Sequence, residues 1–73
     1  MSYDYSKLLG RIKEKCGSQA TFARAMDLSE RTVVLKLSNR RDWKQNEIDK
    51  SCLVLDIPKS DIPIYFFTPI VQY

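Results

Sequence analysis

Apolar residues recur along this chain at steps of three and four, in stretches that are short. This spacing places apolar side chains on one face of an α-helix, so nearly the whole chain is predicted to be helical. The stretches are separated by residues that stop or turn a chain, such as Gly17, Asp27 and Pro69. Short helices gain most of their stability by packing an apolar face against other elements. The spacing therefore predicts a compact all-α domain.

Five helices are predicted, with an extended tail at residues 70–73 and a polar loop at residues 38–42. Ser18, Ser29 and Ser60-Asp61 are the expected N-caps of the second, third and last helices, with side-chain oxygens that accept from free N–H groups of the first turn. Pro63 fits the first turn of the last helix, where its missing N–H does little harm. The helices are expected at residues 6–15, from the cap Ser18 to Met26, from the cap Ser29 to Leu37, at residues 45–55, and from Ser60 to Phe67.

The length of 73 residues leaves room for one domain, covering residues 1–73. Apolar residues make up 44% of the chain and charged residues 29%, which is typical of a globular protein. No apolar run approaches the roughly 20 residues that a bilayer crossing needs. The N-terminus also lacks the basic and apolar regions of a secretory signal. We therefore expect a cytoplasmic protein with no membrane contact.

The residue types argue against an enzyme. The chain has no histidine, which excludes His-based acid–base catalysis and His-containing zinc sites. Its two cysteines, Cys16 and Cys52, continue helical apolar stripes and are expected to be core thiols. The nine carboxylates form no paired constellation, and no Gly-rich phosphate loop is present. We expect no catalysis, metal, cofactor or small-molecule ligand.

Basic residues concentrate between Arg31 and Lys44. This segment holds five basic residues and one acidic residue, whereas the rest of the chain holds seven basic and eight acidic residues. A phosphate backbone attracts such a segment through Coulomb forces and counterion release. The segment is therefore a candidate DNA contact, although a solvated loop can have the same composition.

Residues 19–37 have the spacing of a helix-turn-helix. Two helices that cross steeply need a small residue where they touch, and Ala23 stands there. The second helix begins with the polar residues 29–32, as a helix that meets base edges requires. The inner faces are apolar, at Phe22, Met26, Leu28, Val33 and Leu37.

This segment resembles the helix-turn-helix of the phage repressor and Cro family, the Xre-type regulators. Gln19 resembles the glutamine that opens the second helix in many members, and residues 28–29 resemble the apolar–Ser step into the recognition helix. Residues 37–41 and 55–58 are similar to the family's basic loop and to the ending of its fourth helix. The likeness covers about residues 6–67 and implies a five-helix, lambda-repressor-like fold.

Two positions depart from the family pattern. Asp27 stands where the turn usually has glycine, and Asp tolerates positive φ better than most side chains. Lys36 stands three residues after Val33, where an apolar residue is expected, so Leu37 is predicted to fill the core instead. Both departures affect which face of the recognition helix points outward.

The resemblance implies base-reading residues at the start of the third helix. Arg31 is suited to guanine and Glu30 to the cytosine amino group, and Leu35 is suited to a thymine methyl. Thr32 lies on the flank of this face. Other interpretations stay open: a phosphate contact for Arg31, a favourable helix-dipole interaction for Glu30, and core packing for Leu35.

Six residues are predicted to contact DNA phosphates. Gln19 lies at a helix N-terminus, which favours phosphate, although it also fits a plain surface position. Trp43 is expected to anchor the loop to the core, with stacking on a sugar or base as the alternative. The predicted phosphate contacts are Gln19, Lys36, Asn39, Arg40, Arg41 and Lys44.

The C-terminal segment is too apolar to be solvated throughout. Part of it is expected to pack on the first and fourth helices, and the surplus is a candidate dimer surface. The alternative is a tail that only completes its own core. The dimer candidates are Phe66, Phe67, Ile70, Val71 and Tyr73.

The resemblance implies a sequence-specific, DNA-binding transcriptional regulator of the Cro type, encoded by a phage or prophage. Its expected partner is a double-stranded DNA operator, bound as a homodimer at least on DNA. Two alternatives stay open. One is the antitoxin of a toxin–antitoxin pair, and the other is a protein-interaction adaptor that keeps this fold without binding DNA.

Overall fold

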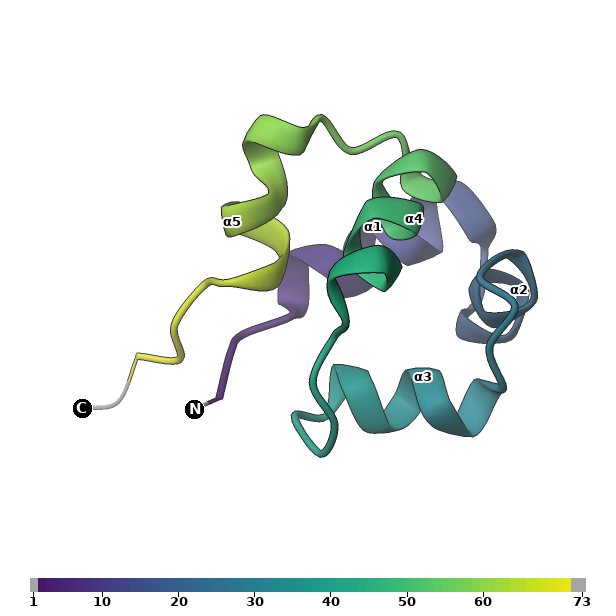
Figure 1. The fold of residues 1–73 in the computed structure, drawn as a ribbon, viewed down its shortest axis with the longest axis horizontal. Helices are drawn as coiled ribbons and strands as arrows, with labels where there is room; N and C mark the ends of the chain where they lie inside the picture. Colours follow the sequence, from purple (N-terminus) through teal and green to yellow (C-terminus); the bar gives the residue numbers. More distant parts are fainter. Residues whose placement is uncertain (1, 72–73) are drawn as a thin grey trace.

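A computed structural model describes residues 2–71 of the chain (Figure 1). Its helices lie in the order and close to the positions predicted, so the all-α fold is confirmed. None of them is long and apolar enough to cross a bilayer within the part described. The elements are α1 (Ser6–Cys16), α2 (Gln19–Ala25), α3 (Glu30–Leu37), α4 (Gln45–Leu55), the 3₁₀ helix η1 (Lys59–Asp61) and α5 (Ile62–Phe66).

The predicted caps and turns explain where α2 and α3 begin. The Ser18 hydroxyl accepts from the Thr21 N–H at 3.1 Å, and the Ser29 hydroxyl accepts from the Thr32 N–H at 3.1 Å. Gly17 has a φ of 83° at the end of α1, which only glycine adopts without cost. Each of these boundaries follows from a local preference that the sequence shows.

The core lies between α1 and the other helices. Ala23 is 2% exposed, as a close helix contact requires. Cys52 is buried as expected, and burial raises the pKa of its thiol, whereas Cys16 is half-buried against the core. The largest fully buried side chains are Leu8, Ile12, Phe22, Val33, Leu55 and Phe66, with Ser51 as a small polar member.

The segments around Tyr3 and Pro69, near the two ends of the described chain, lie side by side (Figure 1). Tyr3 forms an isolated antiparallel bridge with Pro69, and the Asp4 N–H donates to the Thr68 carbonyl at 2.8 Å. Tyr3 also reaches the loop that follows α3, where it meets Asn39. The N-terminal segment therefore connects the end of α5 to the end of α3.

Candidate nucleic-acid interface

The turn between α2 and α3 is formed by two features of the backbone. Asp27 adopts a left-handed φ of 59°, and the Leu28 N–H donates to the Ala23 carbonyl at 2.9 Å. These two features reverse the chain between the helices. As a result, α3 runs along one edge of the molecule, with α2 near its start and the loop after α3 at its other end (Figure 1).

The outward face of α3 carries part of the predicted base-reading set. Glu30 and Arg31 are exposed, as predicted. Thr32 and Leu35 are half-buried, and the Thr32 hydroxyl accepts from the Ser29 hydroxyl at 2.8 Å. Val34 is 46% exposed and was not predicted to belong to this face. Glu30, Arg31 and Val34 are therefore the most accessible α3 side chains.

Lys36 is not a surface residue, so its predicted phosphate contact is corrected. Its side chain is 4% exposed, and its ammonium lies 2.7 Å from a carboxylate oxygen of Glu47. The ammonium also donates to the Asp42 carbonyl at 2.9 Å and lies 5.9 Å from the centre of the Trp43 ring. A position three residues after Val33 faces the core, and a charge there must be paired. The pair therefore replaces the apolar contact of the family pattern.

Glu47 is the partner of Lys36, and the sequence did not reveal this pairing. Its carboxylate binds Lys36 and accepts the Lys44 N–H at 2.8 Å, which caps the start of α4. Burial raises the pKa of Glu47, but the hydrogen bonds from Lys36 and Lys44 and their charges outweigh it, so the net pKa is lowered. The available signals were a lysine at an apolar helix position and a glutamate in the first turn of α4.

Asn39 is also used inside the molecule, and its phosphate contact stays a prediction. Its side-chain amide accepts from the Tyr3 N–H at 2.8 Å and donates to the Tyr3 carbonyl at 2.9 Å. Both ends of the amide are thus occupied by the main chain of one residue. Sequence spacing could not show this contact, because the two residues are 36 positions apart.

Three predicted phosphate contacts remain accessible in the loop. Arg40, Arg41 and Lys44 are exposed, and in residues 2–71 neither they nor Arg31 have a carboxylate oxygen within 4.0 Å. Gln19 is half-buried at the start of α2. The structure therefore places Arg31 on α3 and three further cations in the loop that follows it and at the start of α4.

Trp43 anchors this loop to the core, as predicted. Its ring centre lies 5.4 Å from that of Phe66 in an edge-on contact and 6.5 Å from that of Phe22. Its buried indole N–H has no hydrogen-bond partner in the part of the chain that is described. A buried donor without a partner is uncommon in proteins. The indole N–H therefore needs an explanation from what surrounds it.

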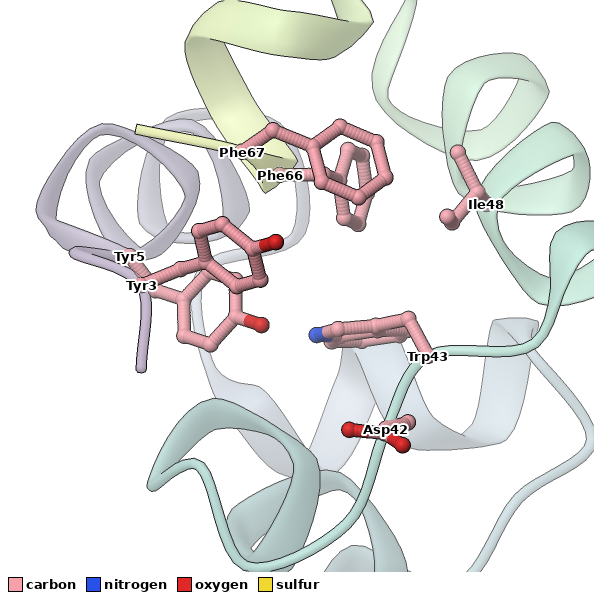
Figure 2. Close-up of a pocket in the computed structure, with 7 residues that line it drawn as sticks. All are labelled: Tyr3, Tyr5, Asp42, Trp43, Ile48, Phe66 and Phe67. Carbon is pink, nitrogen blue, oxygen red and sulfur yellow. The ribbon is translucent and has the colours of Figure 1, made fainter. Parts of the chain in front are cut away.

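A cavity of about 370 Å³ opens beside Trp43 (Figure 2). The indole nitrogen points toward Tyr3 and Tyr5, whose hydroxyls extend into this space. Burial raises the pKa of Tyr5, and the charges of Tyr3 and Asp42 add to this effect. We call this cavity the aromatic pocket. It is lined by Tyr3, Tyr5, Asp42, Trp43, Ile48, Phe66 and Phe67.

The predicted dimer surface is only partly available. Phe66 is 1% exposed and belongs to the core, so its role at a dimer surface is corrected. Phe67, Ile70 and Val71 are 46%, 44% and 69% exposed, and Tyr73 lies outside the described residues. Within residues 2–71, no group of three or more Cys, Asp or Glu side chains could hold a metal ion.

Comparison with known proteins gives a family and a close structural likeness. A family model described as "Protein of unknown function (DUF739)" matches residues 1–69. The chain is also similar to the modulator of repression (MOR) of the temperate bacteriophage TP901-1 from Lactococcus lactis, known from its solution structure. The two share 58% identity with a TM-score of 0.82, covering 99% of this chain and 97% of that one. No curated protein matches the chain.

Proposed function

The chain belongs to the DUF739 family, and we propose that it modulates repression as a regulatory protein of a temperate phage or prophage. The observation that carries this proposal is the 58% identity with a phage modulator of repression over nearly the full length of both chains. A modulator of repression changes how strongly a repressor controls its operators. This chain could do so by contacting either the DNA or the repressor, and the site suggests how each contact would be made.

The first proposed contact is with double-stranded DNA. The outward face of α3 would enter the major groove, with Arg31 positioned for guanine and Val34 for a thymine methyl. The three cations after α3 would hold phosphates. Four exposed cations per copy predict a plot of log affinity against log salt with a slope of about −3 to −4. Because Lys36 and Asn39 are used internally, this binding is expected to be weaker than the sequence alone suggests.

Selection of duplex DNA from a random pool tests this contact. We expect enrichment of a preferred site, two-fold symmetric if two copies bind through the exposed Phe67 and Ile70. Arg31→Gln should relax the preference, whereas the matched control Lys59→Gln, in η1 beyond the other end of α4, should leave it unchanged. If no sequence is enriched and binding does not depend on salt, the DNA contact is refuted.

The second proposed contact is with a protein, and the aromatic pocket favours it. The indole N–H of Trp43 has no partner within residues 2–71, and the exposed ring of Phe67 lies at the same pocket. A repressor could place an apolar group against the exposed ring of Phe67, and so be held away from its operator. This corresponds to the adaptor alternative, in which the fold acts without DNA.

The protein contact is tested by titrating the chain with the repressor encoded nearest to its gene. Trp43 is the chain's single tryptophan, so its fluorescence reports directly on the pocket. We expect a saturable change in emission that Phe67→Ala weakens and Leu53→Ala, a change of an exposed apolar residue on α4, does not. Co-purification with a toxin would instead favour the antitoxin alternative. A repressor that leaves both the fluorescence and the sedimentation of the chain unchanged would refute the contact.

A further inference from the structure

Asn39 stands immediately before two of the exposed cations, yet its side chain turns away to bind Tyr3. We propose that Asn39 is a positioning residue, which fixes the basic loop by clamping it to the N-terminal strap. The basic loop is residues 38–44, and the strap is Tyr3 and Asp4. By positioning the basic loop, the strap would contribute to DNA binding. This part of the proposal rests on the proposed function. The clamp itself can be tested without DNA.

The clamp consists of two hydrogen bonds between one side chain and one main-chain residue. The Tyr3 N–H donates to Oδ1 of Asn39 at 2.8 Å, and Nδ2 of Asn39 donates to the Tyr3 carbonyl at 2.9 Å. Because the side-chain amide meets both bonds at once, its plane is fixed relative to the strap. Both bonds are partly shielded from water, which strengthens them relative to exposed ones.

The backbone conformation of Asn39 sets the direction of the basic loop after α3. Asn39 has a φ of 64°, in the left-handed region that asparagine tolerates better than most residues. The N–H groups of Arg40 and Arg41 both donate to the Leu35 carbonyl, at 2.9 and 3.2 Å, and so close the end of α3. The reversal at Asn39 thus sets the direction in which the two arginines leave the helix.

The strap is itself held on its other side. The Asp4 N–H bonds to Thr68, and the Tyr3 ring packs edge-on against Phe67 with their centres 5.5 Å apart. The basic loop is therefore held by the bonds of Asn39 to the strap, by the bond of the Asp42 carbonyl to Lys36 and by the packing of Trp43 in the core. If the strap bonds are lost, the loop keeps its contacts at Asp42 and Trp43, but residue 39 is no longer tied to the strap.

Amide hydrogen exchange of residues 40–42 tests the clamp in the absence of DNA. Asn39→Gly keeps the left-handed backbone but removes both bonds, and Tyr3→Pro removes the N–H donor. We expect either change to speed exchange of these amides roughly ten-fold, consistent with the loss of one or two hydrogen bonds. Tyr3→Ala is the matched control, because it removes the ring but keeps the main-chain bonds, and it should leave the exchange near that of the parent.

The double variant decides whether Asn39 acts through the strap. If it does, Asn39→Gly combined with Tyr3→Pro should exchange no faster than the faster single variant. Effects that multiply, or single variants without effect, would overturn the proposal. Asn39→Asp provides a second route should Asn39→Gly fold poorly. It keeps the acceptor for the Tyr3 N–H but loses the donor, so an intermediate exchange rate is expected.

Affinity for a selected duplex separates the clamp from a direct phosphate contact. Under the proposal, Asn39→Gly and Tyr3→Pro weaken binding several-fold, and the double variant is no weaker than the worse single one. A double variant that binds more weakly than the worse single variant would mean that Asn39 touches DNA itself and would contradict a pure positioning role. If no duplex binds, the proposed DNA contact fails, while the exchange experiment still decides the clamp.

Discussion

Replacing Glu47 with glutamine should destabilise the protein far more than an ordinary surface change. The change keeps the size of the side chain and one acceptor oxygen but removes its charge. The Lys36 side chain is 4% exposed and that of Glu47 is 12% exposed, so water can do little to replace the lost charge. The Lys36 ammonium would be left with neutral oxygens, from Asp42 and from the new amide.

The expected loss of stability follows from the burial of the Lys36–Glu47 pair. Breaking a buried ion pair by removing one partner costs about 3–5 kcal/mol. We expect about 3 kcal/mol, because the glutamine oxygen can still accept from Lys36 and from the Lys44 N–H. A domain of this length has a total stability of roughly 4–11 kcal/mol, so this loss is a large share of it. It corresponds to a fall in Tm of about 12–24 °C.

Urea unfolding followed by Trp43 emission is a suitable assay, because the indole lies over Lys36 and is the chain's single tryptophan. Asp49→Asn is the matched control: an exposed carboxylate on the same helix, whose loss should change stability by less than about 0.5 kcal/mol. The double variant with Lys36→Met and Glu47→Gln should lose less stability than the sum of the losses in the two single variants. If Glu47→Gln alone stays within about 1 kcal/mol of the parent, the reasoning is refuted.

The same pair predicts a dependence of stability on pH. The pKa of Glu47 in the folded protein lies below its ordinary value of 4.5, so the folded state favours the charged carboxylate. Its contribution is therefore complete above pH 4.5 and is lost as the pH falls through the lowered value. The parent should lose stability over this range, and Glu47→Gln should lose less. If the parent and Glu47→Gln lose the same stability over this pH range, the lowered pKa of Glu47 would be contradicted.

Three further predictions concern single positions. Ser29→Ala, which removes the cap of α3, should cost about 1 kcal/mol in urea unfolding, and a cost below about 0.3 kcal/mol would contradict the cap. Asp27→Gly should be neutral or stabilise by up to about 1 kcal/mol because glycine adopts the left-handed turn freely, whereas Asp27→Val should destabilise, and the reverse order would refute the turn assignment. Arg40→Gln and Arg41→Gln should each lower the magnitude of the salt slope for duplex DNA by about one unit, and an unchanged slope would exclude a phosphate contact at that residue.

Local signals in the sequence were enough to predict the helices. Gly17, Ser18 and Ser29 mark boundaries through preferences of single residues, and the structure places them as expected. Asp27 adopts a left-handed conformation in the turn after α2, as its tolerance of positive φ allows. The core followed from the three- and four-residue spacing of apolar side chains.

The predicted site was less complete, because its contacts join residues far apart in the chain. The pairing of Lys36 with Glu47 and of Asn39 with Tyr3 depends on how α4 and the strap lie against α3. A count of basic residues does not distinguish Lys36 from Arg40, although Lys36 is buried and Arg40 is exposed. The aromatic pocket was missed for the same reason, since its walls come from the N-terminal residues Tyr3 and Tyr5, the basic loop, α4 and the end of α5.

The proposal that this chain modulates repression is tested most directly on a repressor bound to its operator. Footprinting of the operator nearest to the chain's gene would be carried out with the cognate repressor at half saturation, with the chain then added in increasing amounts. The proposal predicts that repressor occupancy changes in a saturable way. Occupancy that stays constant at a large excess of folded chain would contradict it.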